Sequence, residues 1–356
     1  MNALWSLFGF FFAIGVLVSF HELGHYLAAK ACGVKVLKFS IGFGKPLWSH
    51  QTSPETTEWA ISRIPLGGYV KMDEEAFKAQ RLWKRSFIVA AGPLANFVLA
   101  IIFLSILFIS GVKQLPAKLA EPPLDSIAYV AGIYAGDTVT GWKSGNSEEF
   151  RAIFSWNQLR WRLMDALTAK KGFSLEVKTA SGNQQVVVFK EENFSKNNST
   201  QDPITTLGIK PDLTEPISWF SLNVGCWEAI SLSFERVWDV SKVSIRMLLG
   251  MFTGEASIKQ IGGPLSIADM AGKTAQVGWQ SYLGFLALIS ISLGILNLVP
   301  LPMLDGGQLL YDAWELITGR KISASWQNLF QKVGVASLML LTMLALFNDI
   351  SRLFLR

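Results

Sequence analysis

Two histidines stand four residues apart in the chain, His21 and His25, and Glu22 lies between them. On a helix, residues four apart project from one face, so both imidazoles can bind a single Zn²⁺. Glu22 would then lie beside the ion, where it can take a proton from metal-bound water. The chain has only three histidines, and the third, His50, is expected at the surface of a loop. The spacing therefore predicts a zinc-dependent hydrolytic centre.

The segment that carries this motif is apolar, and its first twenty residues contain no lysine or arginine. An ionisable group within a membrane helix costs about 2.5–3.5 kcal/mol and is rarely kept without a function. The alternative is that both imidazoles only pack and hydrogen-bond to neighbouring helices. Their location favours a functional site over that alternative.

The composition is that of a membrane protein. Half of the residues are apolar, only 17% are charged, and there are 13 Trp and 24 Phe, which suit interfacial and lipid-facing positions. Four segments are long and apolar enough to cross a bilayer: residues 4–29, 87–111, 282–301 and 330 to about 347, the last being the shortest. The net charge of +5 does not indicate a nucleic-acid partner, because the basic residues form no recognisable binding motif with aromatics.

The loop between the first two spans sets the expected orientation. It carries ten basic residues against five acidic ones, so the positive-inside rule places it in the cytoplasm. The first and third spans then both run inward, and Asp305, just after the third span, reaches the depth of the histidine pair. Catalytic zinc usually takes three protein ligands and a water. No third histidine follows at a suitable spacing, so Asp305 is the best candidate for the third ligand.

Pro300 and Pro302 precede Asp305 and interrupt helical hydrogen bonding. Irregular backbone at membrane depth is tolerated where protein or water covers it, so these prolines suit a wet cavity. An Asp-Gly-Gly sequence such as 305–307 would by itself more often be a turn at the end of a helix. Asn96 and Asn297 are polar residues within apolar spans, where such residues can join helices by hydrogen bonds.

These motifs together resemble the site-2 protease family of intramembrane zinc metalloproteases. The resemblance rests on His-Glu-Leu-Gly-His at 21–25, Gly-Pro-Leu-Ala-Asn at 92–96 and the string from Asn297 to Gly307, and it covers all four spans. The sequences at 41–44 and 65–70 and an insertion between the second and third spans resemble the regulator-of-sigma-E branch. The resemblance implies a polytopic helical protein of the bacterial inner membrane that cleaves single-pass substrates, such as anti-sigma factors, and leftover signal peptides.

The resemblance also suggests that Asn297 holds the substrate backbone and that Asn96 faces the site. Residues 36–48 alternate in polarity and contain Gly42, Phe43 and Gly44, so they are expected to form a membrane-associated hairpin that pairs with an unwound substrate. The alternative is a plain cytoplasmic hairpin.

The insertion is expected to lie in the periplasm and to contain a β-rich module that resembles a PDZ domain. Its predicted strands are residues 126–130, 138–142, 175–179 and 185–190, with a helix at 156–169. Relatives in the family commonly carry two such domains in tandem, whereas residues 112–212 leave room for one. No clear carboxylate-binding loop is visible, so we expect the module to obstruct untrimmed substrates rather than bind them.

Residues 216–252 show one charged stripe on an otherwise apolar helix, which is expected on the outer membrane surface or against the spans. The expected division is therefore residues 1–111 and 281–356 for the membrane core, 112–212 for the PDZ-like domain and 213–280 for the amphipathic linker. Two other function classes remain open, a metal transporter and a non-catalytic adaptor. A transporter needs no carboxylate beside its ligands, and an adaptor needs neither Glu22 nor His21.

Overall fold

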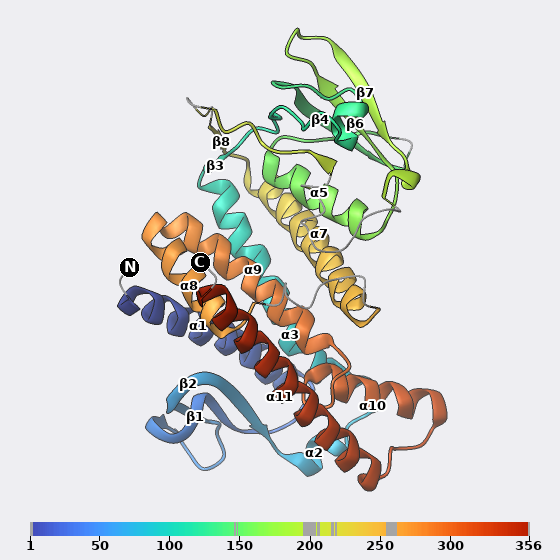
Figure 1. The fold of residues 1–356 in the computed structure, drawn as a ribbon. Helices are drawn as coiled ribbons and strands as arrows, with labels where there is room; N and C mark the ends of the chain where they lie inside the picture. The colour runs from blue at the N-terminus through green and yellow to red at the C-terminus, as the bar shows by residue number, and fades with distance from the viewer. Residues whose placement is uncertain are drawn as a thin grey trace. The chain divides into compact units, whose positions relative to one another are not determined.

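The computed structural model describes residues 3–145, 147, 149–194, 204, 207–214, 217, 219–253 and 262–354 (Figure 1). The helices long and apolar enough to cross a membrane in this part of the chain are α1 (Ala3–Ala31), α3 (Leu82–Ile109), α9 (Trp279–Leu298) and α11 (Ala324–Phe354). The predicted polytopic helical architecture is confirmed. The ends differ: α9 stops at Leu298, and the fourth span is not the shortest. Hydropathy detects only the apolar part of α11 and misses the polar turns at its ends.

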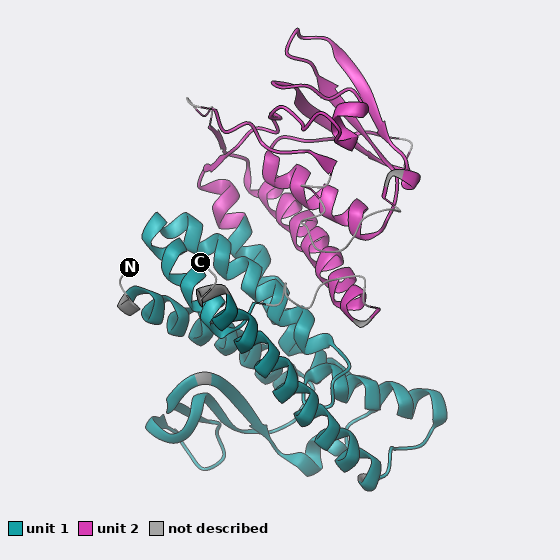
Figure 2. Cartoon of the chain, in the orientation of Figure 1, with its two compact units in different colours: residues 1–104, 259–356 teal, residues 105–258 magenta. Residues whose placement is uncertain are grey.

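The chain divides into two compact units (Figure 2). Unit 1 comprises Met1–Leu104 and Lys259–Arg356, and unit 2 comprises Ser105–Ile258. Unit 1 also contains α2 (Glu74–Lys78), α8 (Pro264–Val277) and α10 (Asp305–Thr318). All the residues of the predicted metal motif belong to unit 1.

Small residues allow close packing of α1 in unit 1. The backbone at Gly9 lies against Ala271 on α8, and a Cβ at Gly272 would overlap Ser6. The Tyr282 hydroxyl on α9 donates a hydrogen bond to the Gly9 carbonyl at 2.6 Å. Helices that approach closely through small residues gain van der Waals contact, which is the main packing force available in lipid.

Two long strands, β1 (Val36–His50) and β2 (Glu58–Met72), form an antiparallel two-stranded sheet in unit 1. The prediction that residues 36–48 form a hairpin by themselves is wrong, because this stretch is a single strand whose partner is β2. Gly42 and Gly44 have φ values of 91° and 88°, and the register is irregular there. The glycines therefore bend the strand, as in a bulge, while the chain reverses at residues 51–57.

Unit 2 contains a four-stranded sheet in the order β5-β4-β6-β7. Its strands are β4 (Thr138–Ser144), β5 (Arg151–Ala152), β6 (Phe173–Lys178) and β7 (Gln184–Phe189). Helix α5 (Trp156–Thr168) buries Leu159 and Leu163 in the same core as Phe173 and Leu175. The predicted strands at 138–142, 175–179 and 185–190 and the helix at 156–169 agree with these elements to within a few residues.

The prediction of a strand at residues 126–130 is wrong. These residues form a short helix, α4 (Ile127–Val130), whose N-cap is Ser126. The Ser126 hydroxyl accepts a hydrogen bond from the Tyr129 amide at 3.2 Å. Serine at an N-cap satisfies a free amide of the first turn, and this local bond outweighs the β-branched and aromatic composition.

The remaining elements of unit 2 include η1 (Glu191–Phe194) and the strand pair β3 (Val112–Gln114) and β8 (Phe220–Leu222). The long helix α7 (Cys226–Phe252) starts later than predicted, since residues 220–222 are extended and Pro216 lies outside the described residues. The charged stripe of α7 faces α5: Asp239 accepts from Arg162 at 3.2 Å, and Arg246 pairs with Asp165. Apolar residues such as Trp227 and Phe234 are exposed.

Asp137 holds a turn of unit 2 together. Its buried carboxylate accepts hydrogen bonds from the Tyr134 amide at 2.9 Å and the Ala180 amide at 3.3 Å. We expect Asp137→Ala to lower the free energy of unfolding by about 1–3 kcal/mol, because both amides lose their acceptor. Denaturant unfolding of the full chain in detergent measures the change. The control is Asp125→Ala at an exposed turn, and equal stability of the two variants would contradict the assignment.

Candidate metal centre

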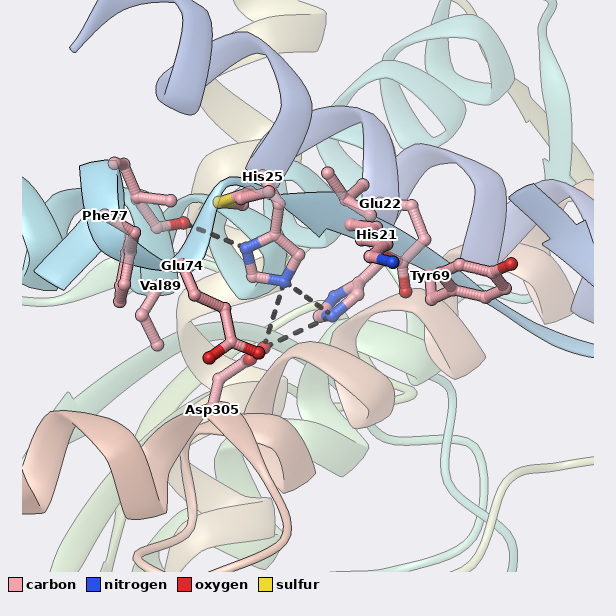
Figure 3. Close-up of a pocket in the computed structure, with 12 residues that line it drawn as sticks. His21, Glu22, His25, Tyr69, Glu74, Phe77, Val89 and Asp305 are labelled. Atoms are coloured by element: carbon pink, nitrogen blue, oxygen red, sulfur yellow. Dashed lines mark hydrogen bonds and ion pairs between the residues drawn. The ribbon is translucent and has the colours of Figure 1, made fainter. Parts of the chain in front are cut away.

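Helix α1 presents His21 and His25 from adjacent turns on one face (Figure 3). Their Nε2 atoms lie 3.2 Å apart, and both residues are largely buried, His21 with 8% of its surface exposed. The i to i+4 spacing of the motif produces this arrangement directly.

Helix α3 holds the far nitrogen of each imidazole. The His25 Nδ1 lies 2.9 Å from the Ile88 carbonyl, and a carbonyl oxygen only accepts, so this Nδ1 carries a proton. The His21 Nδ1 lies 3.3 Å from the side-chain amide of Asn96. The Asn96 Oδ1 is buried without a hydrogen-bond partner, and an end-for-end turn of the amide would let it accept from His21 Nδ1–H. In that arrangement the Nε2 lone pairs of both neutral imidazoles face the same space.

Asp305 supplies a third donor atom from the first residue of α10. Its Oδ2 lies 3.2 Å from His21 Nε2 and 3.4 Å from His25 Nε2. At neutral pH an aspartate side chain is ordinarily ionised, and a metal ion among these donor atoms would keep it so. Two lone pairs and a negative oxygen therefore meet, and a positive charge is needed among them.

The distances fit a metal ion in that position. In a tetrahedral zinc site with bonds of about 2.0–2.1 Å, neighbouring donor atoms are roughly 3.3 Å apart. The three observed separations are 3.2, 3.2 and 3.4 Å. Among the described residues, His21, His25 and Asp305 are the group of His, Cys, Asp or Glu side chains whose ligand atoms lie close enough together to hold a metal ion. Two histidines and one aspartate are also a donor set that suits Zn²⁺ and leaves a position open.

Two glycines allow α3 to approach the histidines. A Cβ on Gly92 would overlap the rings of both His21 and His25, and a Cβ on Gly24 would overlap the Ala91 carbonyl. A second glycine pair lies at the start of α10. A Cβ on Gly306 would overlap the Leu298 and Val299 carbonyls, and one on Gly307 would overlap the Leu301 carbonyl. These glycines let the backbone fold directly from α9 into α10 and bring Asp305 to the imidazoles.

The three donor atoms face a cavity of about 550 Å³. Glu22 lines the same cavity but is not one of the three donors, and Tyr69 of β2 lies beside it (Figure 3). Val70 of β2 also lines the cavity. The remaining lining residues come from β2, α2 and α3 and comprise the charged Lys71 and Glu74 and the apolar Met72, Phe77, Ile88 and Val89. The arrangement offers a metal, a carboxylate base and space for a substrate in one cavity.

The residues predicted to contact the substrate do not line this cavity, although Asn96 contacts His21 beside it. Among the described residues that line the cavity, none is Gly42, Phe43, Gly44, Asn96, Asn297, Pro300 or Pro302. Phe43 stacks on Tyr69 with ring centroids 6.4 Å apart. Asn297 lies in the last turn of α9, and the two prolines lie in the irregular segment before α10, where Pro302 packs against Gly334.

Sequence reasoning missed several contributors to the site. The Ile88 carbonyl has no side-chain signature, so no residue type could have indicated it. The wall formed by Tyr69, Val70 and Phe77 depends on how β2 and α2 fold back toward α1. The glycine in Gly-Pro-Leu-Ala-Asn, Gly92, was noticed only as part of a motif, and its role follows from the contact with the imidazoles.

We expect Gly92→Ala to reduce bound zinc by roughly tenfold or more, because the added methyl group displaces both imidazoles. Metal analysis of the purified protein measures this. The matched control is Gly15→Ala in α1, where a Cβ meets no atom within 4 Å. Zinc content in Gly92→Ala equal to that of the control would contradict the geometry.

We expect Asn96→Leu to weaken zinc affinity by about 10–100-fold, because His21 Nδ1 loses the partner that fixes its tautomer. Asn96→Asp keeps an acceptor at this position and should retain much of the affinity. Competition with a chromophoric chelator compares the variants. Equal affinities of the leucine and aspartate variants would show that Asn96 only fills space.

Comparison with known proteins agrees with this geometry. The model of peptidase family M50 matches residues 9–341. The chain is 34% identical to a protein of Ralstonia nicotianae whose name describes a zinc metalloprotease, over 98% of this chain and 99% of that one. It is 31% identical to the regulator of sigma E protease of Haemophilus influenzae and 30% identical to that of Escherichia coli K12, in each case over 99% of this chain and all of the relative.

The alignment with the Ralstonia protein extends over 459 positions, whereas this chain has 356 residues, so the relative has residues at many positions where this chain has gaps. The family match at residues 9–341 includes α3, α9, α10 and all of α1 from Gly9 onward, and these helices carry the three donor atoms and the residues that hold them. The chain therefore belongs to peptidase family M50, the site-2 protease family of metalloproteases.

Proposed function

We propose that this protein is an intramembrane zinc metalloprotease that hydrolyses peptide bonds in or near the transmembrane segments of single-pass substrates. The observation that carries the proposal is the meeting of His21, His25 and Asp305 within 3.4 Å of one another, with Glu22 in the same cavity. Both histidines belong to a helix that is long and apolar enough to cross a membrane.

The residues of the site divide the chemistry among them. Zinc held by His21, His25 and Asp305 would polarise the scissile carbonyl and activate a water molecule. Glu22 lies on the cavity wall and is not a ligand, so it is free to accept the proton of that water and return it to the leaving amine. The Ile88 carbonyl and Asn96 keep the imidazoles oriented during this exchange.

A transmembrane substrate must be unwound before its carbonyls can be attacked. Residues 38–41 of β1 pair with residues 58–61 of β2 and also with residues 68–71 of β2, so within the described chain β2 keeps an open edge for a further strand along residues 68–72. An extended substrate adding to this edge would lie near Gly42, Phe43 and Gly44, and β2 would lead it toward the cavity through Tyr69. We propose that Asn297, Pro300 and Pro302, which lie at the end of α9 and between α9 and α10, contact the substrate from the side of α10. The exposed apolar residues of the hairpin, including Leu47 and Trp48, support its association with the membrane.

The names of the relatives support a substrate class. Two of them are regulators of sigma E, so we propose anti-sigma-factor-like proteins and remnant signal peptides as substrates. The bacterial relatives and the four apolar helices support a location in the bacterial inner membrane. The excess of basic residues between α1 and α3 favours an orientation with the site near the cytoplasmic face and unit 2 in the periplasm.

We further propose that residues 112–212 form a single PDZ-like domain. The four-stranded sheet with α5 against it and the turn fixed by Asp137 support this assignment. The smaller size of the chain compared with the Ralstonia relative is consistent with one such domain where relatives carry more. We assign it the role of excluding substrates whose periplasmic part has not been trimmed, with residues 213–280 as an amphipathic linker to the second half of the membrane core.

The roles of Glu22 and Asp305 can be separated by experiment. We expect Glu22→Gln to abolish cleavage of a co-expressed, epitope-tagged single-span substrate while bound zinc is retained, because the base is lost but the ligands remain. Asp305→Asn should lose both cleavage and most of the zinc. Immunoblotting measures cleavage, and metal analysis measures zinc.

The exposed Glu121 provides the control, and Glu121→Gln should cleave normally. Undiminished cleavage by Glu22→Gln would overturn the base role. Metal transport that survives in Glu22→Gln would indicate a transporter instead. A cellular phenotype that is unchanged in both Glu22→Gln and His21→Ala would indicate an adaptor.

A further inference from the structure

A buried polar cluster joins the start of α3 to the middle of α10. The Arg85 Nη2 lies 2.5 Å from Glu315 Oε2 and 3.5 Å from Asp312 Oδ1. Asp312 also accepts hydrogen bonds from the Ser86 hydroxyl at 2.9 Å and from Gln308 Nε2 at 3.1 Å. Only 7% of the Arg85 side chain and 4% of the Asp312 side chain are exposed. Arg85 and Asp312 thus have the burial of core residues although they are charged, whereas Glu315 is half-buried.

The cluster and the metal ligands share helix faces. On α10, Asp305, Gln308, Asp312 and Glu315 follow one another at spacings of three and four, which places them along one face. On α3, Arg85, Ile88, Gly92 and Asn96 do the same. One face of α3 therefore contacts both imidazoles through Ile88 and Asn96. At the first turn of α3, Arg85 on the same face contacts α10, the helix that carries Asp305.

The start of α10 packs through Gly306 and Gly307 on the backbone just before it, residues 298–302, and these contacts do not reach α3. The N-cap residue of α10, Leu304, makes no side-chain capping hydrogen bond, and the preceding residues are irregular. The other side of α10 is exposed at Leu310, Trp314 and Ile317. A buried charged cluster adds little net stability compared with apolar packing, but it can fix the relative position of the elements that it joins.

We propose that Arg85, Asp312 and Glu315 are positioning residues that hold the Asp305 carboxylate at ligand distance from His21 and His25. They act through α10 and touch neither the donor atoms nor the substrate. The inference rests on the metal site proposed above, because it concerns the geometry of that site. It predicts that loss of the cluster changes zinc affinity even when the protein remains folded.

The decisive variant is the neutral triple replacement Arg85→Gln, Asp312→Asn and Glu315→Gln. It leaves no unpaired charge in the interior and keeps side chains of similar size, so it separates position from charge burial. Zinc affinity is measured in the purified full chain by chelator competition, and the absorption spectrum of the Co²⁺-loaded protein reports ligand geometry. We expect the zinc Kd to rise roughly 10–100-fold and the Co²⁺ spectrum to change.

The control replaces a different ion pair of unit 1, Asp269 and Lys273 on α8, by Asn and Gln. Its zinc Kd should equal that of the wild type. An unchanged Kd in the folded triple variant would overturn the positioning role while leaving the metal site intact. Absence of zinc binding by the wild type would overturn the metal site and this inference together.

If the triple variant does not fold, Asp312→Asn decides the question, because it retains the pair of Arg85 and Glu315. A rise in its zinc Kd with an unchanged thermal midpoint of the metal-free protein supports positioning. An unchanged Kd overturns it.

Discussion

Three electron-pair donors that face one another across 3.2–3.4 Å impose the constraint on which unit 1 depends. Such atoms repel unless a positive charge lies between them, and they do so in an environment that screens charge poorly. The fold must therefore bring them together against repulsion and keep each from turning away. Helix α1 supplies two donors, α10 supplies the third, and one face of α3 contacts the elements that carry all of them.

In a membrane protein, the polar groups that hold such a site need hydrogen-bond partners more than they would in water. A polar group without a partner is costly there, and the far nitrogens of both histidines have partners on α3. The irregular backbone between α9 and α10 is covered by protein, since Gly306 and Gly307 let α10 pack directly on it. The site thus depends on close backbone approach, which small residues permit.

The sequence predicted the parts of the site that depend on local spacing and on depth. The separation of His21 and His25 fixes their common face, and the loop charges placed Asp305 at the same level as the pair. It also predicted four spans correctly. Two local assignments were wrong. Ser126 caps a helix although the composition of residues 126–130 favoured a strand. Residues 36–48 form one bent strand and were interpreted as a complete hairpin.

Contacts between distant segments could not be predicted in this way. The Ile88 carbonyl is a backbone atom, and Arg85 meets Glu315 across more than two hundred residues of sequence. Neither has a periodicity that a single sequence reveals. The polar ends of α11 were missed because a hydropathy average reports the lipid-facing stretch and not the helix.

The position of Gly92 has a consequence for how related chains are interpreted. Its hydrogen atom occupies the only space left between α3 and the two imidazoles, within the described residues around it. A homologue could keep every donor atom and its base and still be inert if a larger side chain stood there. To distinguish active from inactive members of this family, the residue at the position of Gly92 on α3 must therefore be inspected as well as the metal ligands.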